Sequence, residues 1–246
     1  DELRALGIGG SAAGSGLNTH PEYVRRMSEM LKEQLGTEVR PAENLFAAMQ
    51  SMGPIVAMSS ALRNLALDLV KIANDLRLLS SGPMTGLFEI DLPAVQPGSS
   101  IMPGKVNPVL PEMLNMVCFQ VIGNATVVDY ASQAGQLELN VMMPVIAFDL
   151  FFSTKIMTNA VEALASKCVA GITANVDRCR MYGDMSLSNV TVLNPLIGYL
   201  KAAEIAKRAL KEHRPLRDLV LEEGLVSEEE LDKALNLKQM AHPHES

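Results

Sequence analysis

Apolar residues recur at helical spacing over most of this 246-residue chain. The first such pattern predicts an amphipathic helix from about residue 21 to Gly36, with methionine and leucine on one side and charged residues elsewhere. The second runs from about residue 43 to 79, and Gly53-Pro54 should kink or break it, because proline lacks the backbone N–H that a helix needs. Beyond that break, apolar residues lie on nearly every side, which is typical of a buried helix.

Two more long helices are predicted further along, from about residue 108 to 132 and from about 139 to 169, with Pro144 near the start of the second. The stretch between residues 80 and 108 shows no clear period, and loops of that length inside compact domains are usually functional. Four long, mostly apolar helices with little strand signal predict an all-α fold built on a helix bundle. The apolar excess further predicts that the helices bury surface against other subunits.

After about residue 171 the pattern changes to shorter elements with denser charge. Thr173 or Asn175 is expected to cap a short helix, and Ser227 with Glu230 has the spacing of a capping box. We therefore predict two domains, a central helical bundle over residues 1–172 and a small helical C-terminal domain over residues 173–246.

Composition narrows the functional class. The 48% hydrophobic content supplies a sizeable core, which 15 methionines and aliphatic residues must fill because only 4% of residues are aromatic. The net charge of −7 argues against nucleic acid as a partner. Three widely spaced cysteines predict reduced thiols in a cytoplasmic protein. The most apolar stretch, residues 141–152, is too short to span a bilayer, so no membrane partner is expected.

The chemically active side chains gather in one irregular stretch, Gly98-Ser99-Ser100-Ile101-Met102-Pro103-Gly104-Lys105-Val106-Asn107-Pro108, here termed the signature loop. Asn107 is predicted to cap the following helix and Pro108 to be its first residue, so that free N–H groups and the positive end of the helix dipole face the loop. Together with Lys105 this predicts an anion site suited to a carboxylate or phosphate. The alternative is an ordinary helix-capping loop with a solvated lysine.

Other candidate groups favour structural roles. A glycine-rich loop over residues 8–18 lacks the Gly-Lys-Ser/Thr ending of a phosphate loop, and a tight turn that lets chain segments pack closely is the favoured interpretation. His20 opens a helix, so we expect a structural rather than a catalytic histidine. His213, His242 and His244 are expected to be solvated, with the last two as an alternative weak pair of metal ligands.

The signature loop resembles the GSSxMPxKxNP motif of the fumarase/aspartase superfamily, a long and specific pattern. Further resemblance extends over essentially the whole chain, in residues 14–23, 71–77, 135–141 and 193–199. It implies the family's long-helix bundle and small helical C-terminal domain, with an incomplete N-terminal side, because the family's N-terminal domain and Thr-His segment would lie outside these residues. It also implies a homotetramer whose active sites are each built from three subunits.

The resemblance implies reversible anti-elimination from a small dicarboxylate substrate to give fumarate. It assigns Ser99 as the general base, Ser100, Lys105, Val106 and Asn107 as substrate-binding residues, and Glu112 as a supporting residue that pairs with the family's catalytic histidine. Removing a weakly acidic proton beside a carboxylate needs cations and donors aimed at that carboxylate, which this loop can supply.

Gly98 and Gly104 are expected to let the signature loop move and close over the site. The alternative role of Glu112 is a first-turn acid favoured by the helix dipole. No cofactor is implied; a divalent ion could assist, but no ligand set demands one.

The resemblance does not separate the lyases cleanly. Residues 106–112 and 76–83 look like aspartases, whereas residues 19–23 look equally like fumarases. Met84 departs from the arginine that both usually carry. We expect an aspartate ammonia-lyase, with fumarate hydratase as the alternative and a non-catalytic structural member of the superfamily as a third reading.

Overall fold

The computed structural model describes residues 2–240 as two compact units. The first, termed the bundle unit, comprises the chain up to Leu78 together with Leu92–Ile172. The second, termed the C-terminal unit, comprises Leu79–Asp91 together with the chain from Thr173. A domain boundary after residue 172 stays a prediction, and the structure adds that residues 79–91 pack with the C-terminal unit.

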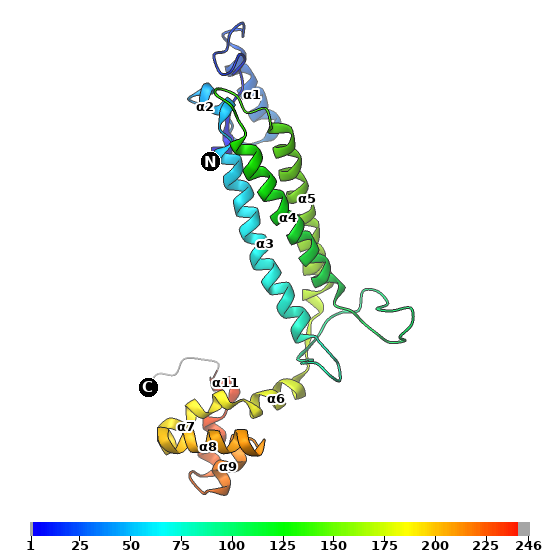
Figure 1. The fold of residues 1–246 in the computed structure, drawn as a ribbon, viewed down its shortest axis with the longest axis vertical. Helices are drawn as coiled ribbons and strands as arrows, with labels where there is room; N and C mark the ends of the chain where they lie inside the picture. The colour runs from blue at the N-terminus through cyan, green and yellow to red at the C-terminus, as the bar shows by residue number, and fades with distance from the viewer. Residues whose placement is uncertain (1, 241–246) are drawn as a thin grey trace. The chain divides into compact units, whose positions relative to one another are not determined.

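The bundle unit starts with short elements and continues into long helices (Figure 1). Its strands β1 and β2 are two residues each and pair in parallel, with Ala5 opposite Arg40. Its elements in chain order are η1 (Glu2–Arg4), β1 (Ala5–Leu6), α1 (Tyr23–Leu35), β2 (Arg40–Pro41), α2 (Leu45–Gln50), α3 (Gly53–Leu79), α4 (Val109–Gln133), α5 (Met143–Lys167) and η2 (Val169–Gly171). The break between α2 and α3 falls at residues 51–52, directly before Gly53-Pro54, which begin α3.

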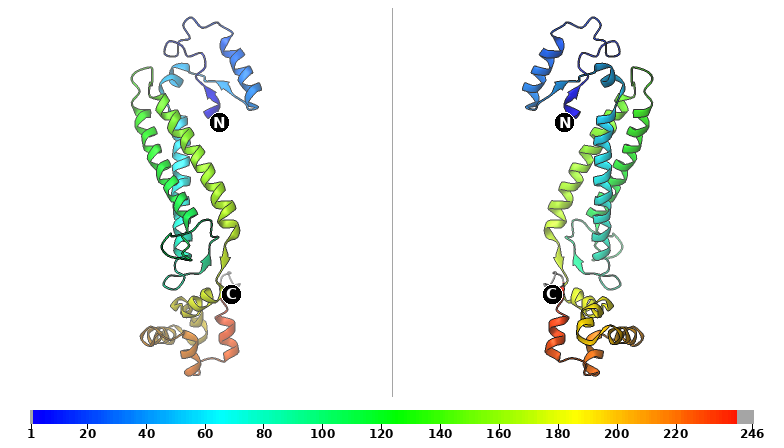
Figure 2. Two further views of the ribbon diagram at one scale, coloured as in Figure 1. Left: turned by 90° about the vertical axis from the view of Figure 1, so that its right-hand side faces the viewer. Right: turned by 90° about the vertical axis from the view of Figure 1, so that its left-hand side faces the viewer.

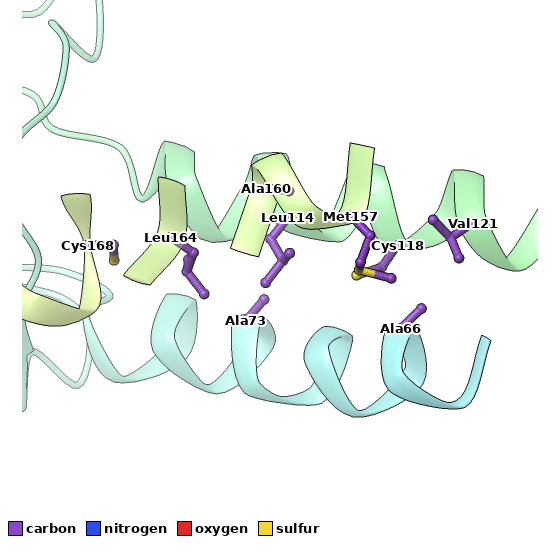
Figure 3. Packing of buried hydrophobic residues seen from close by; sticks show 9 residues of the cluster. All are labelled: Ala66, Ala73, Leu114, Cys118, Val121, Met157, Ala160, Leu164 and Cys168. Carbon is purple, nitrogen blue, oxygen red and sulfur yellow. The ribbon is translucent and has the colours of Figure 1, made fainter. Parts of the chain in front are cut away.

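Three long helices, rather than the predicted four, form the bundle in the described part of the chain: α3, α4 and α5 lie side by side, whereas α1 lies with the short N-terminal elements (Figure 1). Their buried side chains interlock along the bundle axis (Figure 3). Ala66 and Ala73 of α3 point into this core, and larger side chains of α4 and α5 fill the space between the helices (Figure 3). The main core consists of Ala66, Ala73, Leu114, Cys118, Val121, Met157, Ala160, Leu164 and Cys168.

A polar layer interrupts the core between this cluster and a second apolar cluster of Met52, Val128, Ala131 and Ile146. Asn124 of α4 donates to Ser153 Oγ of α5 at 3.0 Å and accepts from Gln120 at 2.7 Å. Ser59 of α3 and Asp149 of α5 are also buried. The Asn124–Ser153 hydrogen bond across the layer offsets the cost of burying those two side chains.

Within the single chain α3 is buried on one face, and burial of its other sides against other subunits stays a prediction. Its buried residues are Ser59, Ala66 and Ala73 on one face, whereas Leu65 and Leu67 on the other sides are about half exposed. The physical reason is that only α4 and α5 cover α3 within one chain.

The C-terminal unit consists of short helices packed around one core (Figure 2). Strand β3 (Ile90–Asp91) pairs antiparallel with β4 (Thr173–Ala174), and the rest comprises α6 (Val176–Met185), η3 (Leu187–Asn189), α7 (Val190–Ile197), α8 (Tyr199–Glu212), α9 (Leu216–Glu222), α10 (Glu228–Ala234) and α11 (Leu237–Met240). Asn175 caps α6 by accepting from the Arg178 N–H, and Ser227 with Glu230 forms the predicted capping box. Within residues 2–240, none of the helices combines the length and hydropathy needed to cross a bilayer.

Candidate active site

The signature loop directly precedes α4, which begins at Val109. Residues 92–108 contain no regular element, and the segment projects from the end of the bundle (Figure 1). Pro97, Pro103 and Pro108 each remove a backbone donor and fix φ, so a helix cannot continue through the segment.

Two hydrogen bonds hold the two ends of the signature loop together at its base. The Gly98 N–H donates to the Lys105 carbonyl at 2.9 Å. The Asn107 side-chain amide donates to the Gly98 carbonyl, also at 2.9 Å. Gly98, Ser99 and Asn107 are half-buried, whereas residues 100–106 are exposed. The base of the loop is therefore held by hydrogen bonds, and residues 100–106 extend into solvent.

Ser99 has two backbone donors on its hydroxyl oxygen. The N–H groups of Ile101 and Met102 both donate to Ser99 Oγ, each at 3.1 Å. Donors aimed at an oxygen stabilise negative charge on it, so they favour the ionised form of a hydroxyl that is otherwise a very weak acid. Sequence reasoning missed these donors, although a serine that accepts from the N–H groups two and three residues later is a recognised turn pattern.

The predicted site residues do not all lie in one place. A cavity of about 450 Å³ is lined by residues 94–99, 102 and 104–106, which brings Ser99, Lys105 and Val106 together. Ser100 is exposed outside that lining, and the Asn107 side chain is directed at Gly98. Glu112 lies half-buried in the first turn of α4.

The predicted start of the following helix is wrong by one residue. Helix α4 begins at Val109, Pro108 is its N-cap residue, and the Asn107 side chain makes no capping bond there because it donates to Gly98 instead. The Val109 N–H donates to the Asn107 carbonyl and Pro111 has no N–H, so few donors in the first turn remain for an anion. An anion at the signature loop would depend on side chains and loop N–H groups more than on the helix end.

The glycine-rich loop serves close packing, as predicted. A Cβ atom on Gly14 would lie 2.5 Å from Phe46 Cα and 2.6 Å from Phe46 N, so only glycine fits against α2. This loop and the signature loop lie at opposite ends of the bundle (Figure 1). The 27-residue helix α3 between them is about 40 Å long.

Two of the histidines, His20 and His213, lie in the described part of the chain. His20 Nδ1 accepts from the Glu22 N–H at 3.2 Å just before α1, which supports the helix start. His213 is the left-handed C-cap residue of α8. His242 and His244 lie outside the described residues. Among residues 2–240, no three His, Cys, Asp or Glu side chains are grouped to hold a metal ion.

A larger cavity of about 800 Å³ lies near the opposite end of the bundle from the signature loop. Residues from β1, α2, α3 and α5 line it, and most of them are apolar. None of the predicted site residues is among them, whereas Ser99, Lys105 and Val106 line the smaller cavity.

Two protein-family models match this chain, one towards each end. A family model described as lyase matches residues 2–123, and one described as fumarase C C-terminus matches residues 190–242. The aspartate ammonia-lyase of Helicobacter pylori is 50% identical over 242 residues, which cover 98% of this chain and 52% of that protein. The chain therefore spans about half the length of the curated relatives it matches.

Solved structures agree with these matches. A fumarate lyase:delta crystallin from Brucella melitensis, solved bound to cobalt, is 45% identical with a TM-score of 0.93, covering 98% of this chain and 52% of that chain. A class II fumarase from Schistosoma mansoni is 37% identical with a TM-score of 0.92, covering 99% of this chain and 54% of that chain. With the signature loop, the helix bundle and both family models in agreement, the chain belongs to the fumarase/aspartase superfamily.

Proposed function

We propose that the complete protein is an aspartate ammonia-lyase, a carbon–nitrogen lyase that converts L-aspartate reversibly into fumarate and ammonia. The 50% identity to the Helicobacter pylori enzyme over nearly all of this chain supports the choice of substrate. The observation that carries the chemistry is the pair of N–H groups on Ser99 Oγ.

Ser99 acts as the general base in this proposal. Its alkoxide, stabilised by the Ile101 and Met102 N–H groups, takes a proton from the carbon beside the carboxylate that is remote from the amino group. The electron pair of that C–H bond becomes the new C=C bond of fumarate. That double bond forms as the C–N bond breaks, and the electron pair of the C–N bond leaves with the amine nitrogen.

The neighbouring residues bind the substrate carboxylate on which negative charge develops. Lys105 supplies a positive charge from the same cavity, and Asn107 and Ser100 supply neutral donors. Val106 contributes its backbone and an apolar wall to the cavity. Glu112 supports the site from the first turn of α4 by pairing with a histidine of another segment.

Fumarate hydratase is the second candidate, since the class II fumarase of Schistosoma mansoni shares the fold at a TM-score of 0.92. The two enzymes would share the proton abstraction and the carboxylate contacts. They differ in the leaving group, which is ammonia from aspartate and water from malate.

The proposed assembly is a homotetramer with composite active sites in the cytoplasm. Large apolar side chains exposed on α4 and α5 support burial against other subunits. The glycine-rich loop over residues 8–18 and the signature loop lie at opposite ends of one bundle (Figure 1). If both loops serve one active site, they must come from different subunits. Free cysteines support a reducing compartment, and fumarate would feed the tricarboxylic acid cycle.

The first test is fumarate consumption by the complete gene product, followed by ultraviolet absorbance with and without ammonium. An aspartase consumes fumarate only when ammonium is present. Consumption in water alone would make the protein a fumarase. No consumption in either condition would contradict both and favour a bulkier amine substrate or a structural member of the superfamily.

The substitution Lys105→Met tests the carboxylate contact. We expect kcat/KM for aspartate to fall by about a hundredfold to a thousandfold, because one preorganised electrostatic contact is lost, while the oligomer stays intact. Lys207→Met, at an exposed position of α8, is the matched control and should retain activity. Wild-type turnover in Lys105→Met would show that this lysine does not bind the substrate.

A further inference from the structure

The base of the signature loop requires glycine at position 98 for a steric reason. A Cβ atom there would lie 2.4 Å from the Lys105 carbonyl oxygen and 2.8 Å from the Lys105 carbonyl carbon. Both are backbone atoms, so no side-chain rotation can relieve the collision. The φ angle of Gly98 is outside the left-handed region, unlike that of Gly104 at +79°. Close approach of two backbone segments, rather than freedom of movement, therefore explains Gly98.

Asn107 completes this contact from the other side. Its amide nitrogen carries two N–H groups, and one of them donates to the Gly98 carbonyl. The backbone of Gly98 is thus bonded at its N–H by Lys105 and at its carbonyl by Asn107. The second N–H of Asn107 remains available to a substrate carboxylate.

We infer that Gly98 and Asn107 form a clamp that sets the separation between the base Ser99 and the cation Lys105. Ser99 follows Gly98 directly, and Lys105 is the residue whose carbonyl accepts from Gly98, so both reacting side chains start from one hydrogen-bonded pair. Only six residues, 99–104, lie between Gly98 and Lys105, and the clamp holds these as one preformed unit. For its substrate, this inference rests on the proposed function.

Gly98 and Asn107 have different roles in the clamp. Gly98 is a positioning residue, since it acts through the placement of Ser99 and Lys105. Asn107 both holds the clamp and contacts the substrate. Fixing the reacting groups before substrate binds removes an ordering cost from the chemical step, so the clamp should affect kcat more than binding.

The test compares Gly98→Ala and Asn107→Ala in the complete gene product. Hydrogen exchange over residues 98–107 measures how firmly the clamp holds the loop. The kcat for aspartate measures the chemical step. The inhibition constant of succinate, an unreactive dicarboxylate, measures carboxylate binding. Gly53→Ala is the matched control, because a Cβ atom there would make only an ordinary 3.5 Å contact with Ser51 Oγ.

We expect Gly98→Ala to speed exchange about tenfold and lower kcat about a hundredfold, while the succinate constant changes less than about threefold. Asn107→Ala should also speed hydrogen exchange. In addition it should weaken the binding of succinate about tenfold, as expected for losing a hydrogen bond to a charged group. Unchanged exchange or unchanged kcat in Gly98→Ala would overturn the clamp. If Gly98→Ala does not fold, the exchange rates of Asn107→Ala decide the question in the same way.

The outcome also separates the clamp from the proposed function. Wild-type protein that releases no ammonia from aspartate overturns the proposed function. In that case, faster hydrogen exchange in Gly98→Ala than in the wild type would still support the clamp. Exchange at the wild-type rate would overturn it.

Discussion

At the scale of single residues, Asp149 of α5 lies inside the bundle with only 8% of its surface exposed. Burial raises the pKa of its carboxyl above the ordinary value of 3.8, because the charged form loses hydration. The folded protein therefore binds this proton more tightly than the unfolded chain. The resulting stability is fully present below pH 3.8 and is lost as the pH rises through the raised pKa.

The substitution Asp149→Asn should accordingly stabilise the protein at pH 7 by roughly 0.5–2 kcal/mol, the range of typical stabilising changes. Thermal unfolding at pH 7 and below pH 3.8 measures the effect, and the difference from wild type should vanish at the lower pH. Asp68→Asn, at an exposed position of α3, is the control. A lower melting temperature for Asp149→Asn at pH 7 would show that the carboxylate has a stabilising partner in the assembled protein.

At the scale of elements, an ion-pair network joins α8 to the end of α9. Arg208 contacts Glu212 at 2.7 Å, Glu223 at 3.1 Å and also Glu222, while Lys201 contacts Glu223 at 2.6 Å. Hydrogen bonds from Arg208 hold the pKa of Glu222 below its ordinary value, and those from Lys201 do the same for Glu223. Isolated surface pairs contribute little to stability, but a shared network of this kind contributes more.

Arg208→Met should lower the melting temperature of the protein at neutral pH. Carboxyls with lowered pKa values stabilise the fold above their ordinary value of 4.5, and this contribution is lost as the pH falls through their folded-state pKa. The difference from wild type should therefore shrink at acid pH and in high salt, as scanning calorimetry can measure. Lys207→Met on the same helix is the control, and an Arg208→Met effect independent of salt and pH would argue for lost packing instead.

At the scale of the whole molecule, the outer faces of α4 and α5 carry large apolar side chains that are exposed in the single chain. Phe148 and Phe151 of α5 are 66% and 72% exposed in the single chain, and Tyr130 of α4 is 67% exposed. The Phe148 and Phe152 rings of α5 stack with their centroids 5.9 Å apart. Surfaces of this kind usually mark protein interfaces.

Phe151→Asp should therefore reduce the molecular mass measured by light scattering and abolish turnover, because a charge would be buried at the proposed subunit contact. Lys207→Asp places the same side chain at an exposed position of α8 and should leave mass and turnover unchanged. An unchanged mass for Phe151→Asp would exclude this face of α5 from the assembly.

Local signals in the sequence predicted much of the fold. Gly53-Pro54 separated α2 from α3, Ser227 with Glu230 marked the start of α10, and apolar spacing located α4 and α5 to within a few residues. The signature loop could be recognised as the candidate site because it combines residue types that packing alone does not require. These features depend on residues a few positions apart, so the sequence by itself determined them.

Tertiary structure decided the features that depend on contacts between distant or unrelated segments. Periodicity did not reveal that three helices rather than four form the bundle, or which face of α3 stays uncovered, because both depend on which neighbours are present. The capping preference of Asn107 predicted a bond to α4, but the folded loop offers the Gly98 carbonyl instead. Likewise the donors to Ser99 and the steric need for Gly98 exist only once the loop has folded back on itself.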